Sequence, residues 1–182
     1  IVAALRWLGL DWDEGYGKDG PHGPYVQSQR LDRYRAATNV LVAQGDAYPC
    51  YCSPEELEQR RRAAEAHGLP PGYDGHCRRL SAEQVRAYVA EGRRPAVRFR
   101  LPDEGETVVE DLIKGETRFD NAVLTDFVVM RANGIPTYML SAAFDDLDMG
   151  ITHVVRGADL FDATPKQVHV FRALGQPVPP RF

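Results

Sequence analysis

The chain has 182 residues, of which 43% are apolar and 26% are charged, and its formal net charge is −4. This composition is typical of a folded domain, and the negative net charge argues against a protein that coats nucleic acid. No apolar run approaches the roughly 18 residues of a membrane-spanning helix, so we expect no membrane contact.

The first half of the chain reads mainly as helices. Helical spacing predicts a helix over residues 1–9, and after a Gly- and Asp-rich loop another helix begins near Ser28. The stretch "AYPCYC" reads as a short extended segment. Ser53 followed by Pro and Glu predicts a capped helix to about Ala66, and Ser81 opens a second one to about Glu91.

From residue 96 the apolar period changes to two, which predicts strands. Four segments carry it: "AVRFRL", "ETVVEDLI", "ETRFDNAVL" and "DFVVMRA". Residues 136–150 read as a helix, "THVVRG" at 152–157 as a strand, and Thr164 opens a last helix that Gly175 ends. Helices alternating with strands around a β-rich middle predict an α/β layer with an inserted α+β subdomain.

All three cysteines lie between residues 50 and 77. An odd count with two members one residue apart is poor material for a disulfide framework, which favours a reducing compartment and a metal site. In an extended segment Cys50 and Cys52 point to the same side, and a turn at "PPGYDG" would bring Cys77 back to them. Zinc takes about four such ligands, with Tyr73 or His76 as the fourth. The alternative is three thiols without metal.

Charge is distributed unevenly along the chain. Residues 51–100 contain ten Arg and seven acidic residues, whereas residues 103–148 contain eleven acidic and three basic residues. The basic segment suits an RNA-facing surface. Arginines on solvated helix faces give the same pattern, and charge alone favours that simpler interpretation.

The chain resembles the catalytic domain of bacterial class I glutamyl-tRNA synthetases over nearly its whole length. Its close relatives, the glutamyl-queuosine tRNA(Asp) synthetases, share part of the same pattern. The stretches that carry the resemblance are "LRWLGLDWDEG", "GPYVQSQRLDRYR", "AYPCYCSPEELE", "YDGHCR", "VRFRLPDEGETVVEDLIKGETRFDNAVLTDFVVMRANGIPTYMLS", "DDLDMGITHVVRGADL" and "TPKQVHVFRALG".

The resemblance implies an incomplete α/β Rossmann-type nucleotide-binding fold with an inserted α+β connective domain. Residues 1–47 would end its first half, residues 48–130 would form the connective domain that binds the tRNA acceptor end and carries the zinc site, and residues 131–182 would begin the second half. Two phosphate-binding motifs of the family, the "HIGH" and "KMSKS" types, would lie outside the chain. We therefore expect this piece to be inactive alone.

The implied reaction is that of a glutamate–tRNA ligase, which activates glutamate with ATP and Mg²⁺ and transfers it to the 3′ end of tRNA(Glu). The expected partners are tRNA, L-glutamate and ATP, in a cytoplasmic monomer. The length of the connective segment favours this enzyme over the queuosine paralogue. A further alternative from another class is a non-catalytic, zinc-stabilised RNA-binding module.

The family's glutamate contacts fall on Tyr138 and Arg156. A guanidinium fork suits a carboxylate and so distinguishes Glu from Gln, and Arg156 ends an expected strand, where α/β sheets place ligands. Some relatives use an Asn where this chain has Ala142, so no polar contact is expected there. Ala158 stands where many synthetases have Glu, which weakens the assignment slightly.

The resemblance also narrows the zinc ligands. Zinc-bearing synthetases place a ligand two positions after the third Cys, where this chain has Arg79, a poor ligand. The queuosine paralogues place a Tyr four positions before it, where this chain has Tyr73. The implied structural site is Cys50, Cys52, Tyr73 and Cys77, with His76 in reserve.

Three other groups invite a functional interpretation. A magnesium site at Asp145, Asp146 and Asp148 is disfavoured against a solvated helix turn, although clustered carboxylates suit hard cations. His153 and His169 are expected to be packed or exposed and not catalytic.

Overall fold

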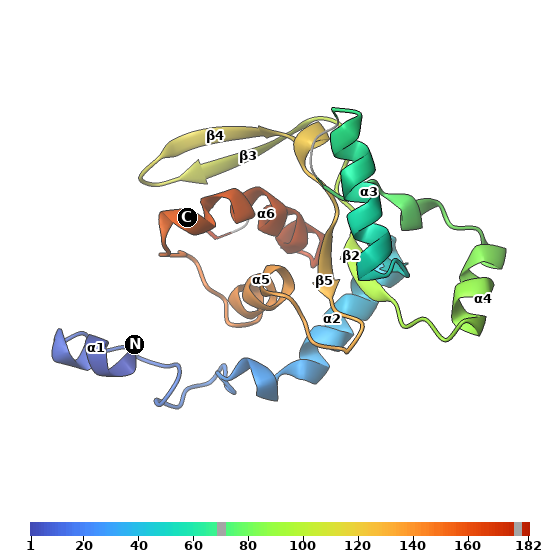
Figure 1. Ribbon diagram of the computed structural model, residues 1–182. Helices are drawn as coiled ribbons and strands as arrows, with labels where there is room; N and C mark the ends of the chain where they lie inside the picture. The colour runs from blue at the N-terminus through green and yellow to red at the C-terminus, as the bar shows by residue number, and fades with distance from the viewer. Residues whose placement is uncertain (69–71, 177–179) are drawn as a thin grey trace. The chain divides into compact units, whose positions relative to one another are not determined.

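The computed structural model describes residues 1–68, 72–176 and 180–182 (Figure 1). The chain forms two compact units, Ile1–Leu31 and Asp32–Phe182. The "PPGYDG" turn expected from the sequence lies partly outside the described residues. None of the helices in the described ranges is both long and apolar enough to cross a bilayer.

The first unit contains helix α1 (Val2–Trp7) and a short 3₁₀ helix, η1 (Gln27–Gln29). Glu14 holds its loop together, because its carboxylate accepts hydrogen bonds from the hydroxyl of Tyr25 and from Nδ1 of His22, the latter at 2.8 Å. The loop between the two helices is therefore fixed by polar contacts among its own side chains.

The second unit is built on a three-stranded antiparallel sheet in the order β1-β2-β5. Its strands are β1 (Ala47–Cys50), β2 (Ala96–Phe99) and β5 (Phe127–Met130). The register shifts between Val97 and Arg98 of β2, which is a bulge. Both Arg98 and Phe99 are buried, so both faces of the sheet are covered at this point.

The strands β3 (Glu106–Asp111) and β4 (Gly115–Asp120) form a separate hairpin (Figure 1). The sequence predicts that β4 continues to Leu124, but a 3₁₀ helix, η3 (Asn121–Val123), replaces its last part. The side chain of Asp120 accepts a hydrogen bond from the amide of Ala122 at 2.9 Å, and Asn121 turns inward to Thr107. These two contacts end the strand.

Four longer helices surround the sheet and the hairpin: α2 (Leu31–Gln44), α3 (Pro54–Ala66), α5 (Tyr138–Asp148) and α6 (Thr164–Ala173). Helix α4 (Ala82–Ala90) and the 3₁₀ helices η2 (His76–Arg79) and η4 (Ala158–Ala163) complete the unit. Helix α6 packs against α5 and β3. The fully buried side chains that form the core include Tyr34, Leu41, Leu101, Val129, Leu140, Val168 and Phe171.

The two helix starts that the sequence predicts at serines are confirmed. Ser53 Oγ accepts a hydrogen bond from the amide of Glu56, and the amide of Ser53 donates to the Glu56 carboxylate at 2.8 Å. Ser81 and Gln84 form the same reciprocal pair. Each pair satisfies amides that a helix otherwise leaves without partners.

The strand predicted at residues 152–157 is wrong. Among the described residues this segment makes a single bridge, from His153 to Arg181, and two backbone hydrogen bonds accompany it. A strand requires a neighbour along several residues, and this segment has one at a single position. The side chain of Val155 is 99% exposed, so the apolar pair at 154–155 is not the buried strand core that the pattern suggests.

Candidate functional site

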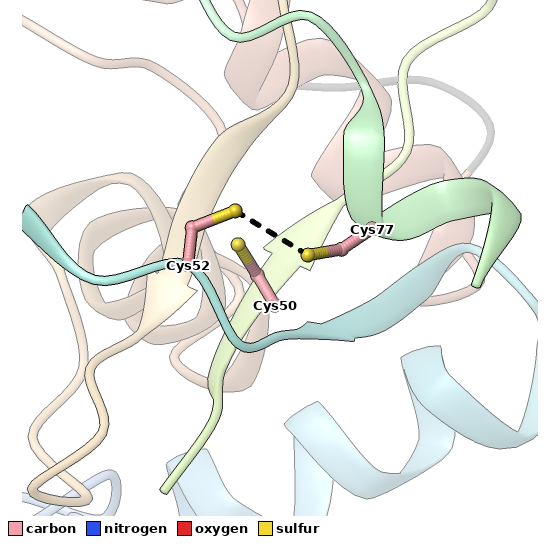
Figure 2. Close-up of side chains that lie close together, drawn as sticks. All are labelled: Cys50, Cys52 and Cys77. Carbon is pink, nitrogen blue, oxygen red and sulfur yellow. Dashed lines mark hydrogen bonds between the residues drawn. The ribbon is translucent and has the colours of Figure 1, made fainter. Parts of the chain in front are cut away.

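The three cysteines converge, as expected from the sequence (Figure 2). Their sulfur atoms all lie within 4.8 Å of one another, and Sγ of Cys52 is 3.5 Å from Sγ of Cys77. Two thiolates on one zinc ion, each about 2.3 Å from it in a tetrahedron, are separated by roughly 3.8 Å. The spacing of the sulfurs therefore fits a single ion, and the three are the only such group within the described residues.

Local structure explains this convergence. Cys50 ends β1, and Tyr51 turns to the opposite side, where its ring stacks on Tyr88 of α4 with centroids 5.6 Å apart. The backbone of Gly75 is left-handed, with φ at 70°, and leads into η2, which carries Cys77. A residue with a side chain is strained in this conformation. The left-handed backbone of Gly75 thus directs η2, and with it Cys77, toward the sheet.

Tyr73 lies at the sulfur cluster. Its Oη is 3.5 Å from Sγ of Cys50 and 3.8 Å from Sγ of Cys52, and it accepts a hydrogen bond from the amide of Cys77 at 2.8 Å. His76 does not belong to the group of ligand atoms that lie within 4.8 Å of one another. It instead lines a surface hollow between α3 and Tyr88. The geometry therefore favours Tyr73 over His76 as a fourth donor.

The electrostatics of the cluster favour a thiolate at Cys50. Hydrogen bonds from Cys52 and Cys77 lower the pKa of Cys50, and Tyr73 and Arg98 add to this effect against the opposing effect of burial. Hydrogen bonds with Cys50 and Cys77, together with burial, raise the pKa of Cys52. Burial, followed by the neighbouring Cys50 and Cys77, raises the pKa of Tyr73.

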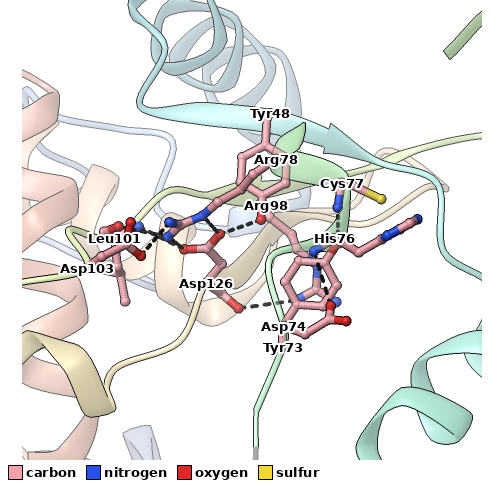
Figure 3. A network of polar contacts seen from close by, with 10 residues as sticks. All are labelled: Tyr48, Tyr73, Asp74, His76, Cys77, Arg78, Arg98, Leu101, Asp103 and Asp126. Atoms are coloured by element: carbon pink, nitrogen blue, oxygen red, sulfur yellow. Dashed lines mark hydrogen bonds and ion pairs between the residues drawn. The ribbon is translucent and has the colours of Figure 1, made fainter. Parts of the chain in front are cut away.

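A buried polar network adjoins the cysteines (Figure 3). The carboxylate of Asp126, which is 4% exposed, accepts hydrogen bonds from the hydroxyl of Tyr48, from the guanidinium of Arg78 and from the amide of Leu101. Tyr48 lies two residues before Cys50, and Arg78 directly follows Cys77. The network therefore holds both cysteine-bearing segments against β5.

The second candidate site contains Arg156 and Tyr138, which the structure brings together. Nη1 of Arg156 donates to Oη of Tyr138 at 3.4 Å and to Oε1 of Gln167 at 2.5 Å, and Nη2 donates to Oγ1 of Thr164 at 2.5 Å. Among the described residues Arg156 forms no ion pair with a carboxylate. The guanidinium is held by neutral acceptors and keeps its charge for a ligand.

Arg156 lines a cavity of about 330 Å³ together with the tip of the β3–β4 hairpin and Phe161. It stands in an irregular segment, which corrects the expectation that it ends a strand. Thr164 and Gln167, which hold it, were read from the sequence only as a helix start. They lie three residues apart on one face of α6, and both are buried. A pattern that marks only a helix start does not predict this burial.

The aspartates of α5 have mostly structural contacts. Both carboxylate oxygens of Asp145 accept hydrogen bonds from Oη of Tyr34, and Asp148 pairs with Arg33 at 2.6 Å. Burial and the charge of Asp145 raise the pKa of Asp146 to about 6, although Arg156 opposes this shift. His169 contacts Thr107 at 2.7 Å and His153 is exposed, as expected for residues outside catalysis.

Comparison with known proteins agrees with this architecture. The model of the family described as tRNA synthetases class I (E and Q), catalytic domain, matches residues 1–182, and the chain belongs to this family. The α/β class I synthetase fold expected from the sequence is thereby confirmed.

The similar proteins are glutamate–tRNA ligases. That of Streptomyces avermitilis is 55% identical over 174 residues, which cover 96% of this chain and 34% of the relative. That of Heliobacterium modesticaldum is 48% identical over 182 residues, or 100% of this chain and 36% of the relative. The crystal structure of the glutamate–tRNA synthetase from Elizabethkingia anophelis has a TM-score of 0.88 at 32% identity, covering 98% of this chain and 38% of that one. The chain spans about a third of the length of these relatives.

Proposed function

We propose that the chain is part of a glutamate–tRNA ligase that activates glutamate with ATP and transfers it to the 3′ end of tRNA(Glu). The observation that carries this proposal is the pairing of Arg156 with Tyr138 beside an open cavity, in a chain whose relatives are glutamate–tRNA ligases. Three free cysteines among the described residues suit the reducing cytoplasm. The monomeric state stays a prediction.

Arg156 is the proposed reader of the glutamate side chain. Gln167 and Thr164 fix its guanidinium, so little rotational freedom is lost when a carboxylate binds. A planar fork binds a carboxylate through two parallel hydrogen bonds, whereas the amide of glutamine presents donors where the fork needs an acceptor. Tyr138, whose hydroxyl accepts a hydrogen bond from Arg156, would help to orient the guanidinium. ATP and Mg²⁺ are substrates whose phosphate-binding motifs the family resemblance assigns to other parts of the enzyme.

The cysteine cluster is the proposed structural zinc site, with Cys50, Cys52, Cys77 and Tyr73 as ligands. The sulfur spacing and the position of the Tyr73 hydroxyl support this donor set. A bound zinc ion would cross-link the end of β1 to η2. Because the site lies apart from Arg156 in the sequence and has no open position once four ligands bind, its role would be to hold the fold.

The proposed connective domain comprises residues 48–130, between residues 1–47 and 131–182 of the two nucleotide-binding halves. Strand β1 at its entry and strand β5 at its exit both pair with β2. β1 and β5 run parallel to each other on either side of β2, so the segment begins and ends within one small sheet, which supports its treatment as a single insertion. Arg61 and Arg62 of α3 and Arg79 of η2 are exposed arginines of this segment, which supports tRNA acceptor-end binding by charge.

One observation favours the queuosine paralogue as an alternative. Tyr73 approaches the sulfurs, and the resemblance assigns a tyrosine ligand to that family. The deciding experiment charges tRNA(Glu) and queuosine-bearing tRNA(Asp) with labelled glutamate, using the full-length enzyme. Glutamate on tRNA(Glu) alone supports the ligase, and glutamate on tRNA(Asp) alone supports the paralogue. No transfer to either would support the non-catalytic RNA-binding module.

A companion experiment concerns residues 1–182 alone. If the phosphate-binding motifs lie elsewhere, glutamate-dependent exchange of pyrophosphate into ATP should be absent for these residues and present for the full-length enzyme. Turnover by residues 1–182 near that of the full-length enzyme would contradict this expectation.

A further inference from the structure

Arg98 is a buried cation without a carboxylate partner among the described residues. It is 8% exposed. Its Nη1 donates to the carbonyl oxygen of Asp126 at 3.2 Å, its Nε donates to Sγ of Cys50 at 3.3 Å, and its guanidinium carbon lies 3.9 Å from the ring centroid of Tyr73. A buried charge is costly unless an opposite charge compensates it. The compensating charge must therefore come from one of these neighbours.

The carboxylate of Asp126 is committed elsewhere. It accepts hydrogen bonds from Arg78, Tyr48 and the amide of Leu101, and Arg98 reaches only the main-chain oxygen of Asp126 (Figure 3). The remaining source of negative charge within hydrogen-bonding distance is the sulfur of Cys50.

The sheet places Arg98 at this position. In the antiparallel register Arg98 is opposite Tyr48, and directly opposite residues point to the same face. Cys50 lies two residues after Tyr48 and shares that face. Arg98 thereby contacts two of the four proposed zinc ligands at once.

Charge counting gives Arg98 a role. Three thiolates and one Zn²⁺ ion sum to one negative charge, and the guanidinium of Arg98, which donates to Sγ of Cys50 at 3.3 Å, offsets it. On the basis of the proposed zinc centre, we propose that Arg98 is its positioning residue, which balances the charge of the three-thiolate site and orients Cys50 and Tyr73. Partners of metal ligands typically contribute 10–100-fold to metal affinity.

The test measures zinc affinity by competition with a chromogenic chelator in the full-length protein. We expect Arg98→Met to weaken zinc binding by about 10–100-fold. Arg98→Lys should recover part of the loss, because it restores the charge without the planar fork. Arg100→Met is the matched control. Arg100 directly follows β2, is exposed and contacts the ring of Tyr48. Its replacement should therefore change zinc affinity less than about twofold.

Cobalt substitution separates a role at the metal from a general packing role. The thiolate-to-cobalt absorption band reports the ligands directly, and we expect it to shift or weaken in Arg98→Met and to stay unchanged in Arg100→Met. Should Arg98→Met fail to fold, Arg98→Gln provides a neutral side chain that still donates a hydrogen bond, and its zinc affinity replaces the first measurement.

The outcomes separate the two proposals. A parent protein that binds no zinc would overturn the metal centre and this inference together. A parent that binds zinc, with Arg98→Met or its Gln substitute matching Arg100→Met in affinity and cobalt spectrum, would overturn the role of Arg98 alone.

Discussion

Asp126 and Arg78 form a buried ion pair that joins β5 to the short helix carrying Cys77. Two guanidinium nitrogens of Arg78 donate to the two carboxylate oxygens of Asp126, whose side chain is 1% exposed. Such a two-point pair fixes direction as well as distance. The position of Cys77 is therefore set by the sheet before any metal binds.

Removing this carboxylate should destabilise the fold. Asp126→Ala removes the acceptor of the Tyr48 hydroxyl and leaves Arg78 with only the exposed Asp103 and the carbonyl oxygen of Leu101. Breaking a buried pair typically costs about 3–5 kcal/mol. Denaturant unfolding of the metal-free protein measures the loss. Asp103→Ala is the control, because Asp103 pairs with the same arginine but its side chain is 83% exposed, and exposed pairs contribute about 0–1 kcal/mol. Equal losses in both variants would contradict the assignment.

The zinc site predicts about one equivalent of zinc per chain by elemental analysis, since four donors complete one tetrahedral ion. Cys52→Ser should lower both the zinc content and the melting temperature. The fall should be at least about 2–4 °C, which is the shift that 1 kcal/mol causes in a domain of this size. Unchanged zinc content in Cys52→Ser would refute this ligand.

The fourth ligand is tested by a pair of variants. Tyr73→Phe removes only the hydroxyl that lies near the sulfurs, so we expect weaker zinc binding with the fold retained. His76→Ala should leave zinc affinity unchanged, because His76 lies outside the sulfur group. The reverse pattern would make His76 the ligand.

Arg156→Ala in the full-length enzyme should reduce kcat/KM for glutamate by roughly 30-fold or more, because losing one partner of a buried charge pair costs about 2–5 kcal/mol. Arg156→Lys should rescue only in part. ATP affinity measured without glutamate should stay constant. Arg172→Ala is the control, because Arg172 is an exposed arginine of the same helix as Gln167. This variant should change neither kcat/KM for glutamate nor ATP affinity. A glutamate kcat/KM within about twofold of the parent would exclude Arg156 as the side-chain reader.

Asp146 predicts a pH-dependent stability difference. Its pKa rises from 3.8 to about 6 on folding, so the folded state binds the proton more tightly than the unfolded state. Stability from this group is therefore highest below about pH 4 and is lost as the pH rises through 6. Allowing for solvent screening, the loss is up to about 2 kcal/mol.

The measurement compares Asp146→Asn with the parent by denaturant unfolding between pH 4 and 7. The variant should gain stability relative to the parent as the pH rises. Asp159→Asn, which changes an exposed aspartate, serves as the control for general charge effects. A stability difference that is flat with pH would refute the raised pKa of Asp146.

Local signals in the sequence predicted the elements that depend on local contacts. The helix starts at Ser53 and Ser81 need only residues within one turn, so their capping pattern was sufficient. The segment at 152–157 has the composition of a strand, but a strand depends on a partner that composition does not specify. Thr164 likewise has the identity of a cap, yet Ala163 is the N-cap and the hydroxyl of Thr164 accepts from Arg156.

Some residues of the candidate sites could be predicted from the sequence and others could not. The cysteines were identifiable because of their residue type, and Arg156 and Tyr138 because of their family motif. Arg98 was not identifiable, because an arginine in the alternating "AVRFRL" stretch reads as a solvent-facing position. Its burial results from the segment around Tyr73 that covers this face, and this cover depends on tertiary packing.

The pairing of β1 and β5 with the same central strand has an evolutionary consequence. Because β2 lies between β1 and β5 in the sequence as well as in the sheet, the two flanking strands keep their register only while residues 96–99 are retained. Insertions and deletions can therefore occur only in the segments on either side of β2, at 51–95 and 100–126. Helix α4 and the β3–β4 hairpin lie in these two segments and contribute no strand to the sheet, so a change in their length would leave the register of β1, β2 and β5 unchanged.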